Sequence, residues 1–170
     1  MYDVIMLIDY IGVFGPAILF IISIIILLNK HIFLYLYIGG CILNIIINFI
    51  LKLLIKEPRP KDDRILFELA TNNGKRIEID RYGMPSAHSQ EVGFSCMYIY
   101  LVTQDIYILW AYLSISFVTM FQRFKYRSHT ILQIIFGFVI GLCIGYIFFI
   151  FAKNIIKGKI SSKKDDNCFL

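Results

Sequence analysis

The sequence predicts an all-α fold, a polytopic membrane bundle of about five transmembrane helices. Hydrophobic residues make up 58% of the 170 residues, and the mean hydropathy is +0.71. A soluble domain has about 45–50% apolar residues, and a chain of this size cannot bury such an excess in one core. The apolar residues also form long runs separated by short polar breaks. Lipid is therefore the expected solvent for most of the chain.

Three of the apolar runs are long enough to cross a bilayer unaided, because spanning the hydrocarbon takes about 20 helical residues. These runs are Ile11–Leu28, Ile32–Leu51 and Ile131–Ala152. A further run, Val92–Val102, is too short unless its helix begins near Ser86, which lengthens it to about 17 residues. Ile106–Met120 completes the set of five.

We expect a single transmembrane catalytic domain over residues 1–152, with a polar loop over 57–85 and a basic tail over 153–170. The loop mixes both charge signs with Pro and Asn-Asn-Gly, which is typical of a solvated surface segment, and a short helix is expected at Ile65–Ala70. The net charge of +5 comes from Lys and Arg in loops and tail, where basic residues meet lipid headgroups or phosphate. Membrane lipids, and not nucleic acid, are the expected partners.

Five crossings place four helix ends on one face of the membrane. These are the end of the second span, the start of the third, the end of the fourth and the start of the fifth. The most unusual polar residues of the chain lie at those ends, in three segments. We therefore expect the three segments to form one site.

The first segment is KLLIKEPRP, residues 52–60. Lys52 lies within an apolar run, and Arg59 follows seven positions later. The two cations share a helical face if the helix persists to the prolines. A charge inside a membrane segment indicates a functional site. The alternative is that Lys52 and Lys56 extend to the interface as anchors, which is the favoured interpretation for Lys56.

The second segment is RYGMPSAHSQ, residues 81–90. Ser86 suits the N-cap of a helix that enters the membrane. That start places Ser86, His88 and Ser89 near the first turn, where free backbone N–H groups favour an anion. The alternative is capping alone, with His88 as a surface histidine.

The third segment is QRFKYRSHTILQ, residues 122–133. Arg123 closes the fourth span and His129 opens the fifth. Gln133 lies one helical turn beyond His129, so its side-chain oxygen can accept a hydrogen bond from the imidazole Nδ1–H. Lys125 and Arg127 are expected to be interfacial anchors.

The combined site has the groups that phosphoryl transfer requires. Cations and a helix N-terminus neutralise a phosphoryl group, one histidine attacks phosphorus, and the other protonates the leaving oxygen. The cations are Lys52, Arg59 and Arg123, and the histidines are His88 and His129. The sequence has no Cys/His ligand spacing, and this chemistry needs no carboxylate cluster, so neither a metal nor another cofactor is predicted.

Taken together, Lys52-x6-Arg59-Pro60, Pro85-Ser86-Ala87-His88 and Arg123-x5-His129 resemble the three-part signature of the type-2 phosphatidic acid phosphatase superfamily. The resemblance implies that His129 is the nucleophile that forms a phosphohistidine and that His88 is the general acid. It also implies phosphate-binding roles for five residues. These are Lys52, Arg59, Ser86, Ala87 (through its backbone N–H) and Arg123.

Three residues depart from the superfamily pattern. Ala87 replaces a Gly, Gln122 replaces a Ser, and Gln133 stands where most members have an Asp that orients the nucleophile. A Gln can orient the imidazole but adds no negative charge, which raises the hypothesis of a weakened enzyme. The strings GMPSAHSQ and HTILQ, however, are similar to those of the dolichyl diphosphatase branch, which also has Gln at this position.

That branch implies a metal-independent hydrolase that converts dolichyl diphosphate into dolichyl phosphate and phosphate in the endoplasmic reticulum. The reaction recycles the lipid carrier used in N-glycosylation. Two alternatives stay open: a phosphatase for phosphatidate or sphingoid phosphates, because the motifs do not contact the lipid tail, and a non-catalytic protein that binds lipid phosphates. Charge distribution alone favours a cytoplasmic site, whereas the resemblance implies a lumenal site with a cytoplasmic tail.

Overall fold

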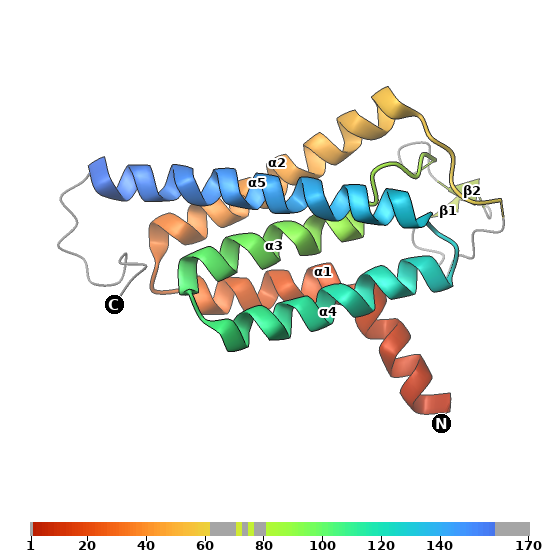
Figure 1. Ribbon diagram of the computed structural model, residues 1–170, viewed down its shortest axis with the longest axis horizontal. Helices are drawn as coiled ribbons and strands as arrows, with labels where there is room; N and C mark the ends of the chain where they lie inside the picture. Colours follow the sequence, from red (N-terminus) through yellow and green to blue (C-terminus); the bar gives the residue numbers. More distant parts are fainter. Residues whose placement is uncertain (1, 62–70, 73–74, 77–80, 159–170) are drawn as a thin grey trace.

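Five α-helices lie side by side in the computed structural model, which describes residues 2–61, 71–72, 75–76 and 81–158 (Figure 1). Two strands of two residues each, β1 (Thr71–Asn72) and β2 (Lys75–Arg76), pair antiparallel with Thr71 opposite Arg76. The expected all-α bundle is confirmed. The expected short helix at 65–70 and the end of the basic tail lie outside the described residues. The helices are α1 (Tyr2–Leu27), α2 (His31–Ile55), α3 (Ala87–Thr103), α4 (Ile106–Lys125) and α5 (Ile131–Gly158).

Within the described ranges, three of the helices are long and apolar enough to cross a membrane. They are the three helices whose apolar runs were long enough to cross a bilayer unaided. Their presence makes this an integral membrane protein. Helix α5 continues past Ala152, the expected end of the last span, to Gly158. The spanning segments are Leu7–Leu27, His31–Ile55 and Ile131–Ile156.

Helix α3 is the central helix of the bundle. It has 17 residues and begins directly after Ser86, as expected. It packs against each of the other four helices, so most of its side chains face protein and few face lipid. This position explains why α3 can carry Ser, Gln and Glu side chains without the hydropathy of the outer helices.

Helices α3 and α5 approach closely along a row of glycines in α5. A Cβ atom on Gly141 would overlap the carbonyl oxygen of Gln90, and one on Gly137 would lie 2.5 Å from the carbonyl oxygen of Ser86. Small residues at every fourth position allow two helix backbones to pack this closely in a membrane. The contact fixes the start of α3 against the start of α5, where two of the predicted motifs lie.

The end of α2, the start of α3, the end of α4 and the start of α5 gather at one end of the bundle (Figure 1). Strands β1 and β2 lie at this same end, and the last turn of α5 lies at the opposite one (Figure 1). The expected convergence of four helix ends is confirmed.

Candidate active site

His129 is buried between the end of α4 and the start of α5, with only 3% of its surface exposed. Its Nδ1 atom lies 2.9 Å from the carbonyl oxygen of Gly83 and 3.2 Å from Oε1 of Gln133. Both partners are acceptors, so Nδ1 carries the hydrogen. Nε2 lies 2.9 Å from Nη1 of Arg59, which can only donate. The partners thus assign the neutral tautomer with a free electron pair on Nε2, the nucleophilic form.

The surroundings keep His129 uncharged. Burial lowers its pKa well below the usual value, and the positive charges of Arg59, Lys52, His88 and Arg123 lower it further. These four charged residues come from all three predicted segments. A neutral imidazole among cations is suited to an anionic ligand, whose charge the cations would balance.

Arg59 reaches His129 by a route that differs from the expected one. Helix α2 ends at Ile55, and Lys56 adopts a left-handed conformation with φ of 52° whose N–H donates to the carbonyl of Lys52. The expectation that Lys52 and Arg59 share a helical face is therefore wrong. The turn after α2 folds Arg59 over the start of α5, where its Nη1 also donates to the carbonyl of Ser128 at 2.7 Å.

Lys52 is buried, with 4% of its surface exposed. It is the last residue of a stripe on α2 that faces the interior of the bundle, so it does not extend to the interface as an anchor. The adjacent Lys56 is exposed, as expected of an anchor. The other buried residues of the stripe are Phe33, Tyr37, Gly40, Cys41, Asn44 and Asn48.

The loop before α3 is held to α5 by its backbone. Ser86 lies at the N-cap position, but its side chain makes no capping hydrogen bond, so the expected capping role of the hydroxyl is wrong. Its N–H donates to the carbonyl of Gln133 at 3.1 Å, and its Oγ accepts from Ser89 at 3.0 Å. Ser86 is fully buried, whereas Ala87 and His88 are half-buried.

Two buried asparagines that the motifs did not identify support this loop, together with Gln90 at the end of the second segment. The Nδ2 atom of Asn48 donates to the carbonyl of Pro85 at 3.2 Å and to Oε1 of Gln90 at 2.8 Å. Gln90 in turn donates to Oδ1 of Asn44 at 2.9 Å. The network ties α2 to the start of α3. Its sequence signal was the four-residue spacing that runs from Asn44 through Asn48 to Lys52.

A tight turn between α4 and α5 brings Arg123 close to His129. Arg127 has a φ of 51°, and the N–H of Ser128 donates to the carbonyl of Arg123 at 3.0 Å. Gln122, which sequence comparison marked only as a departure, is 1% exposed, and its Oε1 accepts from Nε of Arg123 at 2.6 Å. Gln122 therefore orients the guanidinium group.

The two expected anchors near this turn are exposed. Lys125 forms an ion pair with Asp9 of α1 at 2.8 Å, and Tyr126 donates to the same carboxylate at 2.7 Å. With Arg127 and His129, Lys125 lines a pocket of about 620 Å³. The contact with Asp9 joins α1 to the end of α4, which is a structural role.

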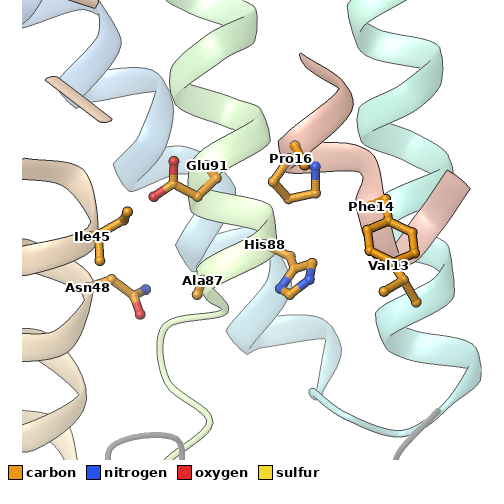
Figure 2. A pocket seen from close by; sticks show the side chains of 9 residues that line it. Val13, Phe14, Pro16, Ile45, Asn48, Ala87, His88 and Glu91 are labelled. Carbon is orange, nitrogen blue, oxygen red and sulfur yellow. The ribbon is translucent and has the colours of Figure 1, made fainter. Parts of the chain in front are cut away.

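A second pocket, of about 290 Å³, lies beside His88 between α1, α2 and α3. Figure 2 shows the imidazole of His88 on the side of α3 that faces Phe14 and Val13 of α1, with Glu91 one turn further along α3. Most of the lining is apolar. The lining residues are Val13, Phe14, Pro16, Ala17, Ile45, Asn48, Ala87, His88 and Glu91.

Comparison with known proteins identifies a matching family and several similar proteins. The family model of the PAP2 superfamily matches residues 33–157. The chain is 34% identical over 131 residues to a dolichyldiphosphatase of Saccharomyces cerevisiae, with 69% of the chain and 51% of that protein covered. It is 26% identical over 137 residues to dolichyldiphosphatase 1 of Homo sapiens, with coverages of 71% and 53%.

A third relative is a palmitoyl-protein thioesterase-dolichyl pyrophosphate phosphatase fusion of Schizosaccharomyces pombe, 30% identical over 118 residues, with 63% of the chain and 17% of that protein covered. The chain spans about half the length of the yeast and human proteins it matches. No solved structure matches the chain.

Proposed function

This chain belongs to the PAP2 superfamily, and we propose that it is a membrane hydrolase that converts dolichyl diphosphate into dolichyl phosphate and phosphate. The observation that carries the proposal is the state of His129. Its Nε2 atom carries no hydrogen, and its electron pair accepts a hydrogen bond from Nη1 of Arg59 at 2.9 Å. The positive charges of Lys52, His88 and Arg123 also act on this imidazole. An oxyanion bound at these cations would place its phosphorus next to the nucleophile.

The first step forms a bond between Nε2 of His129 and the terminal phosphorus. The bond from phosphorus to the bridging oxygen breaks, and protonated His88 gives its proton to that oxygen as dolichyl phosphate leaves. In the second step His88 takes a proton from water, whose oxygen attacks phosphorus. The P–N bond breaks, its electron pair returns to Nε2, and phosphate is released. Gln133 orients His129 throughout.

The remaining predicted residues hold the phosphoryl oxygens. Lys52, Arg59 and Arg123 supply positive charge, and Ser86 and the backbone N–H of Ala87 supply donors. Charge develops on the transferred phosphoryl group, so donors fixed in advance at these positions lower the barrier. Since these groups stabilise the charge themselves, we propose that the reaction is independent of metal ions.

The pocket beside His88 supports a lipid as the leaving group. In an in-line displacement the leaving oxygen lies opposite the attacking nitrogen, so the lipid departs on the side of the general acid. The apolar walls supplied by Ile45, Val13 and Phe14 suit a hydrocarbon chain. We further propose a location in the endoplasmic reticulum with a lumenal site, where the product serves again as a carrier in N-glycosylation.

The test is phosphate release from a panel of lipid phosphates by the detergent-solubilised chain in EDTA. We expect the highest kcat/KM for dolichyl diphosphate and no turnover by His129→Ala. A matched control is His31→Ala, because His31 is exposed at the opposite end of α2. Higher kcat/KM for phosphatidate or a sphingoid phosphate would contradict the substrate. Binding without turnover of any lipid would contradict the enzyme.

A further inference from the structure

The carboxylate of Glu57 forms a hydrogen bond with Gln133, the residue that contacts Nδ1 of His129. Glu57 lies in the turn after α2, and its Oε1 atom accepts a hydrogen bond from Nε2 of Gln133 at 2.7 Å. Oε1 of Gln133 lies 3.2 Å from Nδ1 of His129. Two successive hydrogen bonds therefore connect the carboxylate of Glu57 to the imidazole. The sequence motifs gave no indication of this residue.

The amide of Gln133 can adopt only one orientation in this network. Its Nε2 donates to Glu57 and to the carbonyl of Pro58 at 3.0 Å. Its Oε1 accepts from Nδ1 of His129 and from the backbone N–H of Thr130 at 3.2 Å. Rotation of the amide by 180° would face donors with donors and acceptors with acceptors. Gln133 is also fully buried, so water does not compete for these positions.

Glu57 also holds the second acceptor of His129. Its carbonyl accepts from the N–H of Gly83 at 2.8 Å, and the carbonyl of Gly83 lies 2.9 Å from Nδ1 of His129. Any side chain at position 83 would collide with Gln133, because a Cβ atom there would lie 2.5 Å from Oε1 of that residue. Glu57, Gly83 and Gln133 thus pack as one unit against the imidazole.

We propose that Glu57 is a positioning residue that transmits its negative charge through the Gln133 amide to His129, a role that rests on the proposed phosphohistidine chemistry. A carboxylate bonded to the amide N–H polarises the amide and makes Oε1 a stronger acceptor. The phosphorylated imidazole is cationic, and among the described residues the positive charges of Lys52, Arg59, His88 and Arg123 already act on this ring, while Lys125 and Arg127 line the same pocket as His129. Glu57 offsets these charges, which an uncharged Gln133 cannot do alone.

The first test is Glu57→Gln, which keeps the shape and an acceptor atom but removes the charge. We expect kcat to fall roughly tenfold with little change in KM, because hydrogen bonds to charged groups are about twice as strong as neutral ones. The matched control is Asp9→Asn, which removes a carboxylate that contacts Lys125 and Tyr126. We expect Asp9→Asn to lower thermal stability and leave kcat unchanged.

A second readout does not depend on the substrate. Histidine labelled with ¹⁵N gives signals from three residues in this chain, and the Nδ1–H proton of His129 reports the strength of its hydrogen bond. In Glu57→Gln we expect that proton to move upfield and the acid limb of the His129 titration to move to lower pH. An unchanged resonance would overturn the inference even if the chain proved to hydrolyse a different lipid.

Recovery of kcat by a second substitution distinguishes a positioning role of Glu57 from a purely structural one. In the double variant E57Q/Q133D the charge is moved one residue closer to His129, and we expect kcat to recover most of the loss caused by E57Q. If E57Q lowers the melting temperature and kcat together, and Q133D restores neither, Glu57 is only a structural contact and the proposal is wrong. The comparison uses the melting temperature and kcat of each variant, so a poorly folded single variant is still informative.

Discussion

Contacts at both ring nitrogens hold His129 in one neutral tautomer. Acceptors at Nδ1 fix the hydrogen there, and Arg59 donates to Nε2. The ring is buried among positive groups that disfavour its protonation, so the proposed nucleophile is already in the neutral form without substrate. In the proposed mechanism, substrate displaces the contact between Arg59 and Nε2, after which the same guanidinium can hold a phosphoryl oxygen.

The pH dependence of Arg59→Gln tests this electrostatic balance. In the proposed mechanism neutral His129 is the reactive form, so we expect the acid limb of kcat/KM in the free enzyme to report its pKa. Arg59 lowers that pKa; its removal therefore raises the pKa and shifts the acid limb to higher pH. We also expect kcat/KM to fall about 10- to 100-fold, from the loss of a charged hydrogen-bond partner.

The control for this charge effect is Lys56→Gln. Lys56 is an exposed cation three residues before Arg59. Its removal should change neither the pH of the acid limb nor the value of kcat/KM. If the acid limb of kcat/KM in Arg59→Gln stays at the wild-type pH or moves to lower pH, the role assigned to Arg59 is contradicted.

The charged and imidazole residues of the candidate site could be predicted from the sequence. Most of the residues that hold these side chains in position could not. Lys52, His88 and His129 were identified because a charge or imidazole near an apolar run is rare. Gln122, Asn48 and Glu57 were missed, because each acts through a partner that is distant in sequence or has no motif of its own. The path of Arg59 depended on a left-handed residue after α2, which the sequence KEPRP does not specify.

At the scale of elements, the contact between α3 and α5 sets the distance between the two histidines. His88 lies in the first turn of α3, and His129 lies two residues before α5. The backbones of these helices touch at Gly137 and Gly141, so no side chain separates them. A small displacement there would move the proposed general acid, His88, away from the proposed nucleophile, His129, and near-attack geometry is sensitive to such shifts.

Gly141→Ala tests this contact. An added methyl group would overlap the carbonyl oxygen of Gln90, and overpacking of this kind costs about 1–3 kcal/mol. We expect a lower melting temperature in detergent and a lower kcat. Gly39→Ala is the matched control, since a Cβ atom there meets nothing within 4 Å, and it should leave both quantities unchanged or raise stability slightly. Equal behaviour of the two variants would contradict the close packing.

At the scale of the whole molecule, the fold separates a catalytic end from an opposite end. Apolar runs predicted the three long spans in α1, α2 and α5, because crossing the hydrocarbon requires about 20 apolar residues. The start of α3 followed from Ser86, and Arg123 lies in the last turn of α4, which continues to Lys125. The proposed lumenal orientation, by contrast, runs against a simple count of basic residues and needs direct measurement.

Cysteine labelling in sealed microsomes measures the orientation. In a background without native cysteines, Lys61→Cys lies at the catalytic end and Gln104→Cys lies in the connection between α3 and α4 at the other end. We expect a membrane-impermeant maleimide to label Gln104→Cys in intact vesicles and Lys61→Cys only after detergent. Gly39→Cys, within α2, is a control that stays unlabelled before detergent. The reverse pattern would place the site in the cytoplasm.

The proposed reaction requires that His129 become covalently phosphorylated without a metal ion. The most direct measurement mixes the chain in EDTA with dolichyl diphosphate carrying ³²P in its terminal phosphoryl group, stops the reaction in alkali, where phosphohistidine survives, and maps the label by mass spectrometry. We expect the label on His129, with none retained by His129→Gln. Phosphate release by wild type without a labelled His129, or release by His129→Gln at the wild-type rate, would contradict the account.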